Sequence, residues 1–335
     1  MVRLASRALV LAGVLAVGLP ACTAEPSDGA TPRARMGQSC TLGAEVQTRV
    51  RELFALGVRL GQNPRAFSKV GDSISAWDFF LKGFERTRPD GSPYHTLTAD
   101  WQQEELDHFA GSFGRTSFAA VGGWSSGIEL LPRYAPKDCV DTDGKRLPPL
   151  LCEFERHRPA LAVIMLGTND VGSRFPLRPT KLNPDWNLEA HLRWILDRTL
   201  ERGIIPVLST IPPLVWRGDS PTALQPAADQ ANLLIRELAT SYRLPLVEFD
   251  RALRRLPRQG LSSDGIHPSW EWQTLSTDLR QADTYGFTQR NLLTLEMLAA
   301  VRSCVAADAP SPDAGPAPTT PSPVAPKRHR DLLPE

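Results

Sequence analysis

The sequence predicts an α/β protein in which helices cover a parallel sheet. Short apolar runs typical of buried strands alternate along the chain with longer segments whose apolar residues recur at helical spacing. Polar motifs also follow directly after three of the apolar runs, and open parallel sheets bind their ligands at the carboxyl ends of the strands. With 335 residues, 41% of them hydrophobic, the chain is long enough for one domain with its own core plus flanking segments.

Five short apolar runs are predicted as strands. They are residues 66–70, 117–121, 161–166, 204–210 and 244–249. Helical patterns lie between them. Residues 188–200 carry five apolar side chains on one face and stop near Gly203, and Leu233, Leu234 and Leu238 are predicted to share the buried face of the following helix.

The two ends of the chain differ from its centre. Arg3 and Arg7 precede an apolar run that is too short to span a bilayer, which predicts a signal peptide over residues 1–21. Leu19-Pro20-Ala21-Cys22 resembles a bacterial lipobox, which would make Cys22 a lipidated first residue; the alternative is an ordinary cleaved signal with an unmodified cysteine. We expect a linker at 22–39, the folded domain at 40–305 and a disordered, Pro/Ala-rich tail at 306–335. The chain is thus expected in the bacterial envelope, lipid-anchored at the outer membrane or cell surface, or secreted.

Four cysteines remain if Cys22 is lipidated, and an even number in an exported chain suggests disulfides. Three pairings are possible. We favour Cys139 with Cys152, which would close a local loop, and Cys40 with Cys304, which would tie the start of the domain to its last helix. Free buried thiols are the alternative.

Charge and spacing argue against two other classes of protein. The 38 basic and 37 acidic residues give a formal net charge of +1, so a nucleic acid is not expected as a partner. The sequence has no Cys-x-x-Cys pair and no histidine at zinc-finger spacing, so we expect no metal site and no cofactor.

Four motifs, far apart in the sequence, contain the residue types of one ester-cleaving site. They are Gly71-Asp72-Ser73, Gly122-Gly123, Gly167-Thr168-Asn169-Asp170 and Asp264-Gly265-Ile266-His267. A serine is a poor nucleophile unless an imidazole accepts its proton, and the imidazole needs a carboxylate to fix its tautomer. Asp264 and His267, three positions apart, can supply that pair for Ser73. Backbone N–H groups of Ser73 and Gly123 and the amide of Asn169 can form an oxyanion hole.

This set of motifs resembles the SGNH hydrolases, also called the GDSL esterase and lipase family. The resemblance covers residues 69–75, 122–125, 167–170 and 264–268, and so spans most of the folded part. It implies a three-layer αβα fold with a flavodoxin-like sheet, a catalytic triad of Ser73, Asp264 and His267, and an oxyanion hole of Ser73, Gly123 and Asn169. Many members have an asparagine shortly before the second-block glycine; residues 118–120 here are Phe-Ala-Ala, so Gly122 and Gly123 remain alternatives.

A rival nucleophile lies inside the second block. Residues 123–127 match G-x-S-x-G, the elbow of α/β-hydrolases, with Ser125 at its centre. That interpretation would leave the motifs at Ser73 and Asn169 without roles, so we favour Ser73.

The expected function is a serine esterase that cleaves small acyl, acetyl-like esters of glycans through an acyl-enzyme. Trp124, Trp216, Trp270 and Trp272 lie near the motifs and are the aromatic groups that could stack on sugar rings, and no long apolar run outside the signal segment is suited to extracting a fatty chain from a bilayer. The alternatives are an acyltransferase to a sugar hydroxyl and a lipase or lysophospholipase. A surface binding protein without turnover is less expected, since a binder needs no triad.

Overall fold

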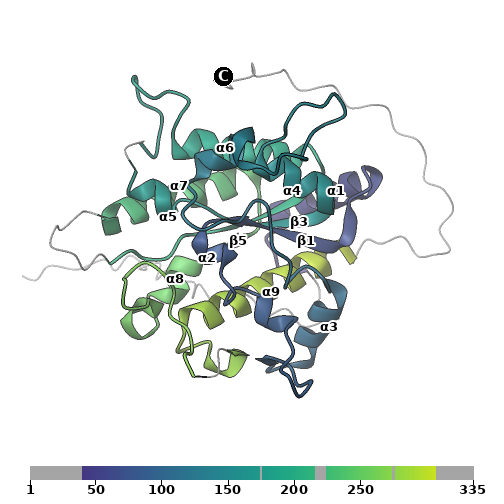
Figure 1. The fold of residues 1–335 in the computed structure, drawn as a ribbon, viewed down its shortest axis with the longest axis vertical. Coiled ribbons are helices and arrows are strands. Elements are labelled where there is room, and N and C mark those ends of the chain that lie inside the picture. Colours follow the sequence, from purple (N-terminus) through teal and green to yellow (C-terminus); the bar gives the residue numbers. More distant parts are fainter. Residues whose placement is uncertain (1–39, 174–175, 216–223, 274–275, 307–335) are drawn as a thin grey trace, which may run out of the picture. The chain divides into compact units, whose positions relative to one another are not determined.

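A computed structural model describes residues 40–173, 176–215, 224–273 and 276–306, and a parallel sheet lies at its centre (Figure 1). Four strands form this sheet in the order β1-β3-β4-β5, and neighbours pair in parallel. Their bounds are Asn63–Gly71 for β1, Pro159–Met165 for β3, Ile205–Ser209 for β4 and Leu246–Val247 for β5. Every residue of β3 is buried, as expected of a strand covered on both faces.

The predicted strand at residues 117–121 forms a single bridge instead of a ladder. Ala120 pairs in parallel with Gly71 on the outer edge of β1. Ser117 Oγ donates to Lys69 O over 2.6 Å. In a regular ladder this carbonyl would accept from a backbone N–H of the neighbouring strand instead. The prediction of an extended strand at 117–121 is therefore wrong, although the segment lies beside β1, where an edge strand would pair. The five runs follow the spatial order second, first, third, fourth, fifth, which confirms a flavodoxin-like sheet.

Helices cover both faces of the sheet (Figure 1). On one side lie α4 (Pro149–His157), α6 (Leu188–Leu200) and α7 (Leu224–Tyr242). On the other lie α3 (Asp100–His108), α8 (Phe249–Leu253) and α9 (Gly286–Ala306), and α1 (Ala44–Arg59) packs against α9. A small second sheet pairs β2 (His95–Thr96) with β6 (Thr277–Asp278). The three-layer αβα prediction is confirmed.

The predicted helix faces are right for α6 and partly wrong for α7. In α6 the five apolar residues of the pattern are all buried. In α7, Leu234 and Leu238 are buried, but Leu233 is 55% exposed. Successive residues of a helix point about 100° apart, and Ile235 rather than Leu233 shares the buried face with Leu234. The last predicted strand is also shorter than residues 244–249, because α8 already begins at Phe249.

Both cysteine pairs favoured from the sequence are bonded in the structure. Cys40 and Cys304 lie with their Cα atoms 4.5 Å apart and join the segment before α1 to the end of α9. Cys139 and Cys152, with Cα atoms 5.7 Å apart, close a loop onto α4. The first bridge thus ties the start of the folded part to its last helix, and the second ties the loop before α4 to that helix.

Several predictions concern residues outside the described part of the chain. The signal peptide, Cys22, the linker, Trp216 and almost all of the predicted tail lie there. Among the residues that the structure does describe, no helix is both long and apolar enough to cross a bilayer. The same residues contain no group of three or more His, Cys, Asp or Glu that could hold a metal ion.

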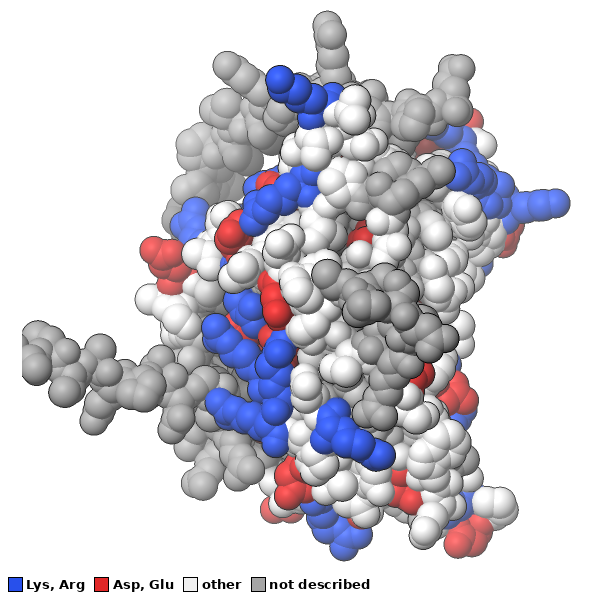
Figure 2. Space-filling view, turned by 90° about the vertical axis from the view of Figure 1, so that its left-hand side faces the viewer, with Lys and Arg blue, Asp and Glu red and all other residues white. Residues whose placement is uncertain are grey.

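Charged side chains of both signs share the surface. On the face shown in Figure 2, Lys and Arg gather in one area with Asp and Glu beside them. Ion pairs of this kind join Arg236 to Glu248 at 2.8 Å and Arg254 to Asp229 at 2.6 Å. Cations and carboxylates are therefore largely neutralised locally, in keeping with the near-zero net charge.

Candidate active site

The four motifs meet at the carboxyl edge of the sheet. Ser73 opens the short helix α2 (Ser73–Ala76) directly after β1, and Asn169 lies in α5 (Thr168–Val171) soon after β3. Asp72 caps α2, its carboxylate accepting a hydrogen bond from Ile74 N over 2.9 Å. This cap ends the strand and turns the chain, so that Ser73 is presented at the sheet edge.

Ser73, His267 and Asp264 form a continuous chain of hydrogen bonds. Ser73 Oγ lies 2.9 Å from His267 Nε2, and His267 Nδ1 lies 2.6 Å from Asp264 Oδ2. Because the carboxylate is an acceptor, Nδ1 carries the ring proton and Nε2 can accept from the serine. The three residues predicted from the sequence are thus brought together in the order that a serine hydrolase requires.

Asp264 is held as a carboxylate by the turn that contains it. Its Oδ1 accepts from Ile266 N at 2.9 Å, from His267 N at 3.0 Å and from Ser262 Oγ at 2.7 Å. Burial alone would raise the pKa of Asp264, but the hydrogen bonds from Ile266 N, from the His267 ring and from Ser262 together lower it to about 2. The carboxylate therefore stays ionised wherever the imidazole is neutral.

Gly265 fixes this turn against the chain that follows β4. Val215 N donates to Gly265 O over 2.8 Å, and Gly265 has a φ of +71°, in the left-handed region. A Cβ at this position would lie 1.8 Å from Val215 O. The turn carrying Asp264 and His267 can approach Val215 this closely only because residue 265 is glycine.

An aromatic group supports His267 from the side. Trp77, at the end of α2, stacks on the imidazole with ring centroids 4.3 Å apart and an angle of 12° between the planes. Trp77 in turn contacts Phe287 and Trp270, with centroids 5.9 and 5.4 Å away. Trp77 is not among the residues predicted from the sequence; its position four residues after Ser73, one helical turn on, is the only signal that could have suggested it.

Arg290 of α9 holds α2, the short helix that begins with Ser73, through hydrogen bonds to two of its residues. Its guanidinium donates to Ile74 O and, over 2.9 Å, to Ser75 Oγ, and it lies 3.6 Å from the centroid of Phe80. Burial lowers the pKa of Arg290 to about 9, so the side chain remains a cation at neutral pH. A buried cation at this carbonyl holds the short helix in place. Arg290 was also missed, since no pattern links it to Ser73.

Of the oxyanion-hole candidates, Gly122 lies directly beside Ser73, and Asn169 is bound to the segment that follows Gly122 and Gly123. A Cβ on Gly122 would lie 3.8 Å from Ser73 Cβ, so Gly122 is the immediate neighbour, whereas Gly123 has a φ of +81° and open space around it. Asn169 Nδ2 donates to Trp124 O over 2.8 Å. An amide has two N–H groups, so the second is available for an oxyanion. The positive φ favours glycine at position 123, whereas a Cβ at position 122 would make only an ordinary contact with Ser73.

Ser125 does not occupy a nucleophile's position. In the part of the chain that is described, no hydrogen bond joins Ser125 Oγ to a histidine or a carboxylate. The residue precedes the short 3-10 helix η2 (Ser126–Leu130) and acts as the start of that turn. The G-x-S-x-G match is a structural turn here.

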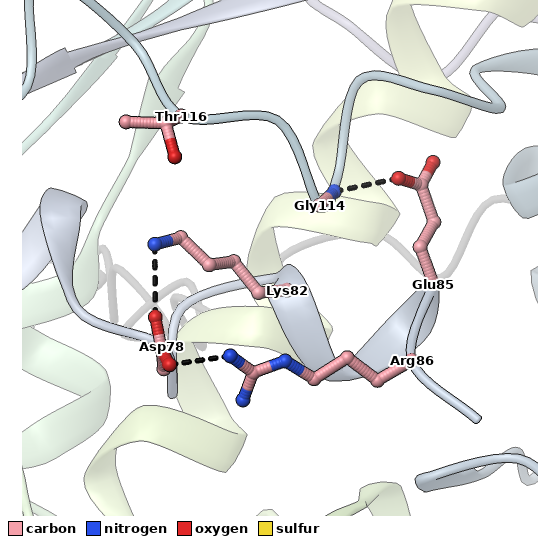
Figure 3. A pocket seen from close by; sticks show the side chains of 6 residues that line it. All are labelled: Asp78, Lys82, Glu85, Arg86, Gly114 and Thr116. Atoms are coloured by element: carbon pink, nitrogen blue, oxygen red, sulfur yellow. Dashed lines mark hydrogen bonds and ion pairs between the residues drawn. The ribbon is translucent and has the colours of Figure 1, made fainter. Parts of the chain in front are cut away.

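A pocket of about 440 Å³ with charged lining residues lies close to the active site. Asp78, which lines it, directly follows Trp77, the residue that stacks on His267. Figure 3 shows Lys82 and Arg86 both pointing at Asp78, and Glu85 pointing at the backbone N–H of Gly114. Asp78 is thus paired with two cations, whereas the Glu85 carboxylate accepts from backbone N–H groups. Its full lining is Asp78, Lys82, Glu85, Arg86, Gly114 and Thr116.

An αβα fold with a Ser–His–Asp chain at the carboxyl edge of its sheet defines the class of serine hydrolases. Residues 70–274 match the GDSL-like lipase/acylhydrolase family, and the match includes the triad, Gly122, Gly123 and Asn169. The chain belongs to this family and is an ester hydrolase of the GDSL type, as the motifs predicted. No curated protein matches the chain.

Solved structures similar to this chain include lipases and an esterase. A GDSL-like lipase from Bacteroides thetaiotaomicron has 15% identity and a TM-score of 0.41, over 77% of this chain and 99% of that one. An acetylxylan esterase from Geobacillus stearothermophilus has 18% identity and a TM-score of 0.40, over 70% and 93%. A lipase/acylhydrolase from Enterococcus faecalis has 16% identity and a TM-score of 0.40, over 70% and 95%.

Proposed function

We propose that the chain is a serine esterase in which Ser73 is the nucleophile, His267 the general base and acid, and Asp264 the residue that orients His267. The observation that carries the proposal is the hydrogen-bond chain from Ser73 Oγ through His267 to Asp264, with distances of 2.9 and 2.6 Å. All three side chains are in reach of one another without rearrangement, which is the geometric requirement for proton transfer.

The reaction follows from these positions in two halves. Ser73 Oγ bonds to the ester carbonyl carbon while its proton moves to His267 Nε2, and the carbonyl oxygen becomes an oxyanion. Collapse of this intermediate breaks the bond to the alcohol, which leaves with the proton from Nε2. Water then attacks the acyl-enzyme, gives its proton to His267, and the acid departs as Ser73 regains the proton.

The oxyanion is proposed to accept from three donors: Ser73 N, a backbone N–H at Gly123 or its neighbour Gly122, and the second N–H of Asn169. Support comes from the first N–H of Asn169, which is already bound to Trp124 O at 2.8 Å and so fixes the amide plane. Loss of one such donor costs about 10²–10³ in kcat in other hydrolases. Asn169→Ala is expected to fall in that range.

For the substrate, we infer small acyl esters carried on glycans. Trp272 supports this inference, because it is 71% exposed yet rests on Trp270, 4.4 Å away between ring centroids. Trp270 stacks on Phe79 at 4.9 Å, within the aromatic group that reaches His267 through Trp77. A rigidly supported, solvent-facing indole is suited to an amphipathic ring such as a sugar.

A graded series of nitrophenyl esters tests the acyl part of this proposal. Turnover is expected to fall from acetyl and butyryl esters to chains of about eight carbons, because added methylenes that stay in water gain none of the roughly 0.8 kcal/mol that burial of each could contribute. Rates that rise with chain length would make the protein a lipase or lysophospholipase. Acetate release from an acetylated polysaccharide, set against acetyl transfer to an added sugar, separates hydrolase from acyltransferase.

We also infer export and attachment to the envelope through lipidated Cys22. The two disulfides support export, because such bonds persist in oxidising compartments. Cys22→Ser should release the protein from membranes or block its processing. An unacylated mature N-terminus in the intact mass would rule out the anchor.

A further inference from the structure

Behind the two segments proposed to hold the oxyanion lies a second group of a serine, a histidine and an aspartate. Asp170 is 6% exposed, Ser126 is fully buried and His191 is 3% exposed. Ser126 Oγ lies 2.5 Å from Asp170 Oδ1 and 2.9 Å from His191 Nδ1, and Ser126 N donates to Asp170 Oδ2 over 3.0 Å. The serine lies between the other two residues, so this group is not a second catalytic triad.

The three residues come from the elements that border the proposed oxyanion hole. Asp170 directly follows Asn169 in α5, and Ser126 opens η2 two residues after Trp124, whose carbonyl accepts from the Asn169 amide. Both carboxylate oxygens of Asp170 are used on one residue of the other segment. Asp170 therefore joins the segment that carries Gly122 and Gly123 to the turn that carries Asn169.

His191 fixes the other side of Ser126. A Cβ on Gly127 would lie 2.8 Å from His191 Cε1 and 2.8 Å from Trp186 Cζ2, and the Trp186 and His191 rings meet edge-on with centroids 4.4 Å apart. The imidazole of α6 is thus enclosed by Ser126, Gly127 and Trp186. A shift of residues 126–127 would be resisted by packing as well as by hydrogen bonds.

The number of protons on these three side chains decides which atom donates in each hydrogen bond. Burial raises the pKa of Asp170, while the two hydrogen bonds from Ser126 act to lower it. A serine hydroxyl has one hydrogen, and where Asp170 is ionised that hydrogen goes to the carboxylate. Ser126 Oγ must then accept from His191, which carries its proton on Nδ1. His191 Nε2 is buried and has no hydrogen-bond partner among the described residues, which costs less for the bare acceptor nitrogen of this tautomer than for an N–H donor.

We propose that Asp170, Ser126 and His191 act as positioning residues for the oxyanion hole, setting the distance between the Gly122–Gly123 backbone and the Asn169 amide. The inference rests on the proposed role of those donors and adds a function for three residues that do not touch the substrate. Misplacing a reacting or stabilising group by about 1 Å can cost on the order of 10² in rate.

Two substitutions of Asp170 can separate an effect of position from an effect of charge, because asparagine can replace its hydrogen bonds but not its negative charge. In D170N, the amide oxygen can still accept from Ser126 N, the amide nitrogen can donate to Ser126 Oγ, and the hydroxyl can turn to donate to His191 Nδ1 in its other tautomer. The two bonds to Ser126 are kept and the negative charge is lost, while the proton on His191 moves to the buried Nε2, which has no partner among the described residues and so costs stability. D170A keeps neither bond.

The experiment measures kcat, KM and the affinity of an alkyl boronic acid, which forms a tetrahedral adduct with the serine, for D170A, D170N and S126A. D170A is expected to lower kcat and boronate affinity together by roughly 10- to 100-fold with KM little changed, and D170N to stay within about threefold of the parent. His191→Leu should lower kcat more in the D170N background than in the parent, because in D170N the Ser126 hydroxyl has only His191 Nδ1 to donate to. Active enzyme is counted by the fluorophosphonate labelling endpoint.

Glu105→Ala is the matched control, because it removes another buried carboxylate, held by Arg302 at 2.8 and 2.6 Å, from a region near the amino ends of the strands. It should lower the melting temperature without changing kcat. Unchanged kcat in D170A and S126A would overturn the inference, as would D170N being as impaired as D170A. If D170A does not fold, S126A and the His191→Leu pair decide. Ser73→Ala retaining activity would instead refute the proposed function.

Discussion

Gly265 is the residue at which one added methyl group is expected to damage the active site most. In Gly265→Ala, the new Cβ would lie 1.8 Å from Val215 O, so the turn or the chain after β4 must move by roughly 1.5 Å before van der Waals contact is restored. The φ of +71° adds strain of about 1–2 kcal/mol for a non-glycine residue. Asp264 and His267 lie on either side of this residue and would move with it.

A displacement of that size is expected to lower kcat/KM by about 100-fold, since His267 Nε2 must stay within hydrogen-bond reach of Ser73 Oγ. Urea unfolding should show a loss of about 1–3 kcal/mol. The assay is hydrolysis of nitrophenyl acetate at equal concentrations of folded protein.

Gly144→Ala separates backbone strain from the clash. Gly144 has a φ of +76°, close to that of Gly265, but nothing lies within 4 Å of its added Cβ. This variant should lose about 1 kcal/mol of stability and no activity. If Gly265→Ala were as active as Gly144→Ala, the contact with Val215 would not hold the catalytic turn, and the reasoning would be refuted.

Three further predictions follow from the site and its surroundings. Trp77→Ala should lower kcat roughly tenfold through loss of the stack on His267, with Trp77→Phe recovering most of it; equal loss in both would contradict this role. Burial lowers the pKa of His191 from its unfolded value near 6.5 to about 4, so on acidification the unfolded state binds a proton before the folded state does. The free energy of unfolding should therefore fall by about 3 kcal/mol between pH 6.5 and 4. This loss should shrink in His191→Leu, and a pH profile of stability unchanged by the substitution would argue against the prediction. Replacing Cys139 and Cys152 by serine should cost about 3 kcal/mol in the loop-entropy model, and an unchanged melting temperature would show that the bridge is dispensable.

The sequence was sufficient for the catalytic motifs because parallel topology brings strand ends together. Ser73 and Asn169 each follow an apolar run, so their proximity could be expected before any coordinates, and Asp264 and His267 are close in sequence. The αβα layering came from the family resemblance. The strand order needed the structure, because local patterns do not specify which strands pair.

The residues that support the site could not be predicted in the same way. Trp77, Arg290 and His191 act through contacts with segments far away in the sequence, and each resembles an ordinary packing residue when seen alone. The bond of His191 to Ser126 forms only when α6 packs beside η2. Asp72 and Asp170 both accept from backbone N–H groups, Asp72 from Ile74 and Asp170 from Ser126.

The central claim is that Ser73 is the nucleophile, and peptide mapping of the protein after reaction with a fluorophosphonate tests it most directly. The account predicts one adduct, on the peptide that contains Ser73, with labelling abolished in Ser73→Ala and largely retained in Ser125→Ala. His267 Nε2, 2.9 Å from Ser73 Oγ, is the base that makes this serine reactive. An adduct on Ser125, or full labelling of Ser73→Ala, would contradict the account.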